Sequence, residues 1–298
     1  MLSKISTELR GISAIPVTPF DSKGNVDEAA LQNSIARMLK SGIKVVVACG
    51  NTSEFLSLTP REIEEVTKST IDAAKGAITI VGVGGDVNSA KAQARHAILS
   101  GAQGVMIHFP NHSYISDDGL IEYYRAIASE TDGAVELYLR GKELSRHVLD
   151  SVVKIENVIA VKYAITDLMG FANFVEVYGS TVVPICGLAE IWAPFYASVG
   201  GTGFTSGLAN VAPTLSLELL SSIEKGDSAR TMELWKLIKP FEDLRAVGSS
   251  SLNVSVVKEA MAQINLISNS TVRPPISTLS ENHKSEITSI LKSWKSFL

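Results

Sequence analysis

A single lysine ends a run of apolar residues in the stretch VIAVKYAITD, residues 158–167. The run Val158–Val161 is typical of a strand buried on both faces, so the stem of Lys162 starts in an apolar environment. Burial disfavours the ammonium form, and a neutral amine can attack a carbonyl carbon to form a Schiff base. The alternative is a lysine that extends its charged end from the rim into water. The sequence therefore offers Lys162 as a candidate nucleophile.

Two further groups could serve the same reaction. Tyr138 lies in the preceding β-rich run, VELYL, and could exchange protons at the carbon that the lysine attacks. The loop GNTSE (50–54) follows another apolar run, and its backbone N–H groups could hold a carboxylate. Within this loop the Thr52 hydroxyl could relay a proton to Tyr138. The alternative for the loop is an ordinary polar connection that caps the next helix.

Other classes of function are disfavoured by composition and spacing. His108 and His112 lie close in sequence, but no further ligand joins them at a metal-binding spacing. Cys49 and Cys186 each close an apolar run without a CxxC motif, so we expect two buried thiols and a reducing, cytoplasmic location. The formal net charge of −4 argues against nucleic acid as a partner. The apolar runs are too short for a membrane span, and the N-terminal residues lack the apolar core of a signal peptide.

A scaffold must hold these groups together, and the chain alternates short β-rich runs with helical patterns. The expected strands span residues 11–17, 45–49, 78–83, 104–109, 135–139, 158–163, 182–186 and 203–206. Eight strand–helix units predict a (β/α)8 barrel, an α/β fold whose active groups lie at the C-terminal ends of the strands. An open doubly wound sheet is the alternative, although GVGGD (82–86) lacks the full glycine spacing of a dinucleotide site.

The strand pattern stops at about residue 228. We expect residues 1–227 to form the barrel and residues 228–298 to form a C-terminal helical extension packed on it. VRPPI (272–276) should separate the last two helices, because paired prolines cannot continue a helix. Trp235 and Trp294 are expected to pack the extension against the flank of the barrel.

Several motifs in this order resemble the dihydrodipicolinate synthase/N-acetylneuraminate lyase family. GNTSEFLSLTPRE (50–62) is similar to its GTTGE segment, GAQGVMIHFP (101–110) to its GADGV strand, and VKYAITD (161–167) to its lysine strand. YLR (138–140) is similar to its YNxP turn, and the likeness runs from about residue 11 to about residue 280. By this resemblance Lys162 matches the Schiff-base lysine, Tyr138 the proton-shuttling tyrosine, and Thr52 a threonine of the relay.

The resemblance implies a barrel enzyme that acts on a small 2-oxo acid, needs no metal or organic cofactor, and forms a homo-oligomer, either a dimer or a tetramer. The implied chemistry is that of a lyase, in which an iminium on Lys162 serves as the electron sink for aldol condensation, aldol cleavage or dehydration. A catalytically weak binding or regulatory barrel is the alternative. The predicted substrate-binding residues are Asn51, Ser53, His112, Arg140, Gly187, Phe204 and Thr205.

The predicted site also departs from the family's pattern. The residues that differ from the synthases are Asn51, Ser53, Asn111, His112, Leu139 and Glu143. Glu143 falls where synthases carry a substrate-binding arginine, a role that Arg140 could take over. YLR then resembles the YNR of 5-dehydro-4-deoxyglucarate dehydratases, so such a dehydratase is the alternative within the family.

Overall fold

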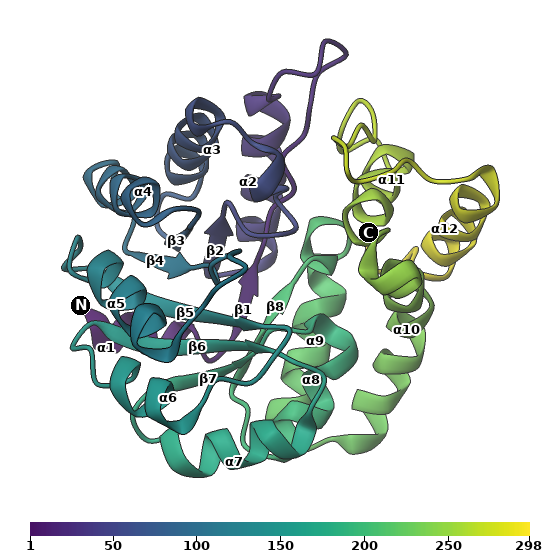
Figure 1. Cartoon of the computed structure of the whole chain (residues 1–298). Helices are drawn as coiled ribbons and strands as arrows, with labels where there is room; N and C mark the ends of the chain where they lie inside the picture. The colour runs from purple at the N-terminus through teal and green to yellow at the C-terminus, as the bar shows by residue number, and fades with distance from the viewer.

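The computed structural model describes all 298 residues and shows a closed barrel of eight parallel strands surrounded by helices (Figure 1). The strands are β1 (Ile12–Ala14), β2 (Val45–Ala48), β3 (Ile78–Val83), β4 (Gly104–Ile107), β5 (Ala134–Arg140), β6 (Val158–Ala164), β7 (Val183–Cys186) and β8 (Gly203–Ser206). They pair in chain order, and β8 pairs with β1 to close the barrel. The predicted (β/α)8 barrel is confirmed, and the open doubly wound sheet is wrong.

Most of the helices that follow the strands begin at a residue whose side chain caps the first turn. They are α2 (Glu28–Ser41), α3 (Pro60–Ala73), α4 (Val87–Leu99), α5 (Asp117–Ala128), α6 (Arg146–Val152), α7 (Leu168–Tyr178), α8 (Ala189–Ser198) and α9 (Pro213–Glu224). The α3 helix starts with a complete capping box formed by Thr59 and Glu62, which satisfies two backbone N–H groups that lack a partner in the helix. No helix has both the length and the apolar character that a membrane crossing requires.

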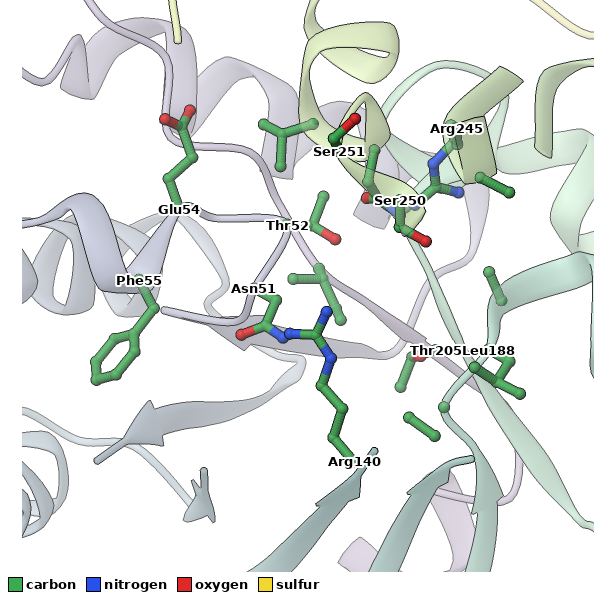
Figure 2. Close-up of a pocket in the computed structure, with 18 of the residues that line it drawn as sticks. Asn51, Thr52, Glu54, Phe55, Arg140, Leu188, Thr205, Arg245, Ser250 and Ser251 are labelled. Atoms are coloured by element: carbon green, nitrogen blue, oxygen red, sulfur yellow. Dashed lines mark hydrogen bonds between the residues drawn. The ribbon is translucent and has the colours of Figure 1, made fainter. Parts of the chain in front are cut away.

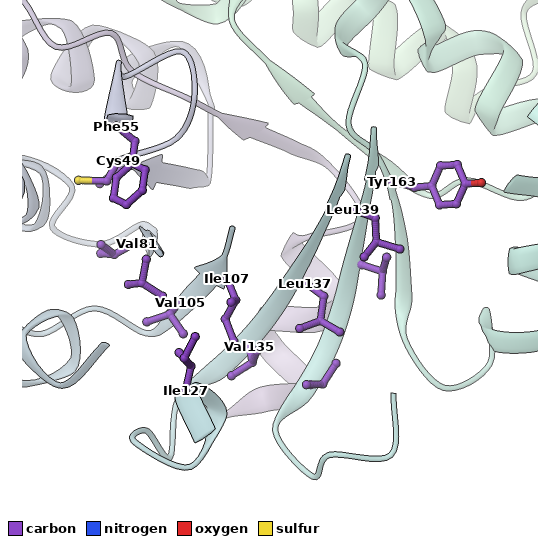
Figure 3. Packing of buried hydrophobic residues seen from close by; sticks show 14 of the residues in the cluster. Cys49, Phe55, Val81, Val105, Ile107, Ile127, Val135, Leu137, Leu139 and Tyr163 are labelled. Carbon is purple, nitrogen blue, oxygen red and sulfur yellow. The ribbon is translucent and has the colours of Figure 1, made fainter. Parts of the chain in front are cut away.

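Two layers of apolar side chains hold the barrel. Because successive strand residues face opposite sides, Val105 and Leu137 point outward and pack under the surrounding helices (Figure 3). Ile80 and Met106 point inward and fill the barrel interior. A helix that the sequence pattern did not predict, α1 (Leu2–Glu8), contributes Ile5 to this inner cluster. Cys49 and Cys186 are free and buried, as predicted.

The C-terminal extension consists of α10 (Ser228–Ser250), α11 (Asn253–Gln263) and α12 (Glu281–Ser293). Trp294 is fully buried in an apolar cluster that the extension shares with Leu215 of α9, and the Trp235 indole N–H donates to the carbonyl of Ile191 in α8. Helical geometry breaks at Val247 and the two residues that follow it, so the end of α10 turns toward the mouth of the barrel. Since the apolar cluster is shared, the division at residue 227 stays a prediction.

Candidate active site

The C-terminal ends of the strands open into a pocket of about 620 Å³, which the extension closes on one side (Figure 2). Ser250 and Ser251 at the end of α10 and Asn253 at the start of α11 contribute to its wall. Seven of the ten predicted site residues line this pocket: Asn51, Thr52, Tyr138, Arg140, Lys162, Gly187 and Thr205. The strand-end rule therefore located the pocket with its lysine and tyrosine, whereas further polar lining residues come from the extension.

Lys162 lies at the base of the pocket, near the end of β6, with 2% of its surface exposed. Its Nζ is 4.0 Å from Sδ of Met106 and 4.1 Å from the centre of the Tyr138 ring, and it forms no ion pair. Burial, together with a smaller effect of the positive charge of Arg140, lowers the pKa of Lys162 to about 8, although Glu136 opposes the shift. About a tenth of the amine is therefore neutral at pH 7, far more than for an ordinary lysine, and this fraction is available for attack on a carbonyl.

A second lysine, Lys258 in α11, shows what a structural buried lysine looks like in the same chain. It has no exposed surface, forms an ion pair with Glu54, and donates to the carbonyl of Thr271 at 2.8 Å. Burial lowers the pKa of Lys258 as well. The two lysines differ in that Lys258 has an anionic partner, whereas the amine of Lys162 faces the pocket without one.

Tyr138 is placed to act on the same atoms as Lys162. Burial raises the pKa of Tyr138, so the phenol stays protonated and can donate a proton. The predicted contact between Thr52 and Tyr138 is not present; the Nδ2 of Asn51 donates to the Tyr138 hydroxyl oxygen at 3.1 Å instead. His108 packs edge-on against the phenol ring with ring centres 5.7 Å apart. Burial lowers the pKa of His108 to about 4, so this imidazole is neutral and supports the ring without adding charge.

The GNTSE loop presents two free backbone donors at the pocket, the N–H groups of Asn51 and Thr52, which have no partner in the chain. The N–H of Ser53 is used within the loop, since it donates to the carbonyl of Gly50 at 3.0 Å. The loop is fixed from the extension, because the Glu54 carboxylate pairs with Lys258 and accepts the backbone N–H of Arg273 at 3.0 Å. Residues from both ends of the sequence thus hold a potential carboxylate-binding N–H beside Lys162.

Comparison with known proteins places this arrangement in a family. Residues 8–294 match the sequence profile of the "Dihydrodipicolinate synthetase family". The chain belongs to that family. A solved structure of dihydrodipicolinate synthase from Oceanobacillus iheyensis superposes with a TM-score of 0.94 at 37% identity, covering 99% of this chain and all of that one.

Curated relatives of this dihydrodipicolinate synthetase family member carry two different names. The chain is 29% identical over 297 residues to a "Probable 5-dehydro-4-deoxyglucarate dehydratase" of Bacillus subtilis, covering 98% of this chain and 96% of the relative. It is 27% identical over 289 residues to a "4-hydroxy-tetrahydrodipicolinate synthase" of Methanothrix thermoacetophila, covering 95% of this chain and 96% of that one. This family member is accordingly an enzyme, a carbon–carbon or carbon–oxygen lyase.

Three predicted binding residues lie outside the pocket of this family member. The Ser53 hydroxyl donates to the carbonyl of Pro16 at 2.6 Å and shapes the loop. Phe204 precedes Thr205 on β8, so it points to the opposite side and packs beneath the helices. His112 is exposed in the loop after β4 and contacts its neighbour Tyr114. The structure does not bring these three side chains into the pocket, so a role for them in substrate binding stays a prediction.

Among the charged residues that the sequence analysis missed at the site, two bear directly on the chemistry. Glu136 lies on β5 inside the barrel and acts on the charge of Lys162, but it was not among the predicted site residues. The signal for it was present, because VELYL places an acid in the middle of an apolar strand. Arg245 of α10 lines the pocket and is held by Glu242 and Asn253. Nothing in the sequence pattern marked Arg245, since it belongs to a helix whose docking onto the barrel is decided by tertiary packing.

Proposed function

We propose that this enzyme forms a Schiff base between Lys162 and the keto carbon of a hydroxylated 2-oxo acid, and then eliminates water from the enamine as a dehydratase. The observation that carries the proposal is a buried amine without an ionic partner beside the Tyr138 phenol, at the base of an open polar pocket. Such an amine is the nucleophile that iminium chemistry requires.

The chemistry follows from the placement of these groups. The neutral amine of Lys162 attacks the keto carbon, and the Tyr138 hydroxyl delivers a proton to the departing oxygen, which leaves as water. The iminium then withdraws electrons from the neighbouring carbon, which gives a proton to the Tyr138 phenolate and becomes part of an enamine. The enamine expels the hydroxyl group one carbon further on, and that group takes the proton back from Tyr138 and leaves as water. The free N–H of Thr52 is placed to hold the substrate's carboxylate during these steps.

Two features support a sugar-acid substrate. Arg140 rises from the end of β5 toward Asn51 (Figure 2), and its guanidinium has no carboxylate partner in the chain. It is therefore free to bind a second carboxylate at the far end of a substrate. The hydroxyls of Ser250 and Ser251 can serve the hydroxyl groups of such a chain. The relatives named as dehydratases of 5-dehydro-4-deoxyglucarate, a hydroxylated dicarboxylate, fit this set of groups.

Aldol condensation of pyruvate with an aldehyde is the second candidate. It is favoured by the 37% identity to the Oceanobacillus iheyensis dihydrodipicolinate synthase along the whole chain. The same iminium and enamine serve this reaction, so the choice depends on the far end of the pocket. A cytoplasmic location and a homo-oligomeric assembly also stay predictions, and light scattering on the purified protein tests the assembly.

Borohydride trapping with pyruvate, followed by peptide mass spectrometry, tests the shared step. We expect one reduced adduct on Lys162; no adduct, or an adduct only on other lysines, would refute the proposal. Substrate choice is tested by Arg140→Leu. This variant should keep pyruvate trapping but raise KM for a six-carbon 2-oxo dicarboxylate by about 10- to 100-fold, the loss typical of a charge-assisted hydrogen bond. Arg140→Lys keeps the charge and serves as the control. An unchanged KM in Arg140→Leu would favour the condensation reaction.

A further inference from the structure

The barrel interior contains a buried acid that the proposed mechanism does not use. Glu136 is 1% exposed, and neither of its carboxylate oxygens has a hydrogen-bond partner. It alternates along β5 with Ala134 and Tyr138, both of which belong to the inner cluster, so its side chain also points inward. A buried acid without hydrogen-bond partners destabilises the fold, so we expect this acid to have an electrostatic role.

Strand register places this acid beneath the amine of Lys162. On β5, Glu136 pairs with Met106 of β4 on one side and with Ala160 of β6 on the other. Lys162 lies two residues beyond Ala160 and pairs with Tyr138. Its Nζ nevertheless approaches Met106 to 4.0 Å and the Tyr138 ring to 4.1 Å. The lysine side chain therefore crosses over β5, and its nitrogen lies between the levels of Glu136 and Tyr138.

The other titratable groups around this nitrogen cannot balance a positive charge. Arg140 at the end of β5 is itself positive. Burial lowers the pKa of His108 on β4 to about 4 and raises the pKa of Cys186 on β7 to about 12, so both are neutral at working pH. The Tyr138 phenol is protonated because burial raises its pKa. Glu136 is the one group facing Lys162 that can carry a negative charge.

We propose that Glu136 is a positioning residue that supplies the buried counter-charge for the iminium formed on Lys162. The inference rests on the proposed Schiff-base step. In that step a bond forms between Nζ and the keto carbon, the carbon–oxygen bond breaks, and the oxygen leaves as water. The water takes one amine proton and one further proton, and the iminium keeps the other amine proton and the positive charge. Tyr138 delivers that further proton, and a negatively charged Glu136 balances the positive charge that stays on the nitrogen.

The ionisation behaviour of the two groups agrees with this role. Burial raises the pKa of Glu136 to about 7, and the charge of Lys162 opposes the shift. Burial lowers the pKa of Lys162, and Glu136 opposes that shift in turn. A pKa of about 7 leaves part of Glu136 protonated near pH 7. An iminium carries a fixed positive charge, so its formation should ionise that protonated part.

Glu136→Gln tests the inference, because glutamine keeps the volume and removes the charge. Without the carboxylate, the pKa of Lys162 should fall. The rate of borohydride trapping rises with pH as this amine loses its proton, and the rise should therefore occur about one pH unit lower. The same change should lower the equilibrium amount of pyruvate adduct at pH 7.5 about tenfold, the factor that corresponds to one pKa unit. A merely looser barrel would not speed trapping at low pH while weakening the adduct.

Two control variants separate charge from packing. Glu136→Asp keeps the carboxylate and should restore most of the adduct. Ser13→Ala removes a different buried side-chain oxygen that has no partner, on β1, and should leave both the pH profile and the adduct unchanged.

If Glu136→Gln does not fold, the wild-type enzyme can still test the inference. Its infrared difference spectrum on adding pyruvate should show the loss of a protonated carboxyl band, and an unchanged spectrum would overturn the inference.

The failure of this inference can be told apart from the failure of the proposed function. A wild-type enzyme that gives no adduct on Lys162 would overturn the Schiff-base proposal itself. A wild-type adduct accompanied by the same pH limb and the same adduct level in Glu136→Gln would overturn only the role of Glu136.

Discussion

Replacing Lys162 by methionine should make the protein more stable while it removes the Schiff-base chemistry. Methionine keeps the length and apolar stem of lysine, so packing against Met106 and Tyr138 is conserved. What disappears is a buried ammonium that has no ionic partner. A residue that lowers the stability of the fold is expected to be kept where the activity depends on it.

The size of the effect follows from the pKa of Lys162. Burial lowers this pKa from 10.5 to about 8, and each unit corresponds to about 1.4 kcal/mol, so the charged amine costs the folded state about 3 kcal/mol. Because the folded pKa of a base is lowered, the cost is complete below pH 8 and vanishes as pH rises to 10.5. At pH 6 Glu136, whose pKa is raised to about 7, is mostly protonated, so removing the lysine leaves no buried negative charge.

The same substitution at Lys258 gives a matched comparison. Lys258→Met leaves the buried Glu54 carboxylate without its cation, so it should destabilise the protein by about 3–5 kcal/mol. The two lysine-to-methionine variants should therefore shift stability in opposite directions. Denaturant unfolding at pH 6 and pH 9.5, with borohydride trapping in parallel, measures both effects. A Lys162→Met variant that is less stable than wild type at pH 6, or whose gain in stability does not shrink at pH 9.5, would refute the reasoning.

Three further outcomes are expected. Tyr138→Phe should slow turnover by roughly 10²–10⁴, the range for a lost proton-transfer group, and near-wild-type rates would remove the phenol from the mechanism. Asn51→Ala should lower kcat by about 3- to 10-fold, because the phenol loses its hydrogen bond, with pyruvate trapping retained; an unchanged kcat would mean that the contact does not orient Tyr138. Glu62→Gln should lose about 1–2 kcal/mol of unfolding free energy at pH 7, since Glu62 pairs with Arg273. The pairing lowers the pKa of Glu62 to about 2 from 4.5, so this contribution is complete above pH 4.5 and disappears as pH falls through 2; a loss that persists at pH 2 in denaturant titrations would contradict it.

The barrel was predictable because each strand is a short apolar run followed by a capped amphipathic helix, and eight such units leave few other ways to bury both faces of a parallel sheet. The predicted element boundaries were wrong where contacts between distant parts of the chain decide the local structure. The first strand was expected over residues 11–17 but is regular only over Ile12–Ala14. The α1 helix has only seven residues and one buried side chain, Ile5, too few for a periodic signal.

The errors at the site have separate physical causes. Phe204 and Thr205 are adjacent on one strand, so only one of them can face the pocket, and alternation alone would have excluded the phenylalanine. The contact of Asn51 with Tyr138 depends on how the GNTSE loop folds. That loop is held by an ion pair between Glu54 and Lys258, which come from distant parts of the chain. No spacing rule connects such residues.

Burial lowers the pKa of two lysines in this chain, Lys162 and Lys258. The difference between their surroundings identifies Lys162 as the reactive one. Lys258 conforms to the general rule that a buried charge is paired, whereas Lys162 breaks it, and so does Glu136 on the adjacent strand. Local rules of folding are broken most often where function requires it. Two buried, uncompensated groups of opposite sign, on β5 and β6, are poor contributors to stability if each is considered alone. They become useful together once a substrate turns the amine into a fixed cation, because only then does the carboxylate have a permanent charge to balance.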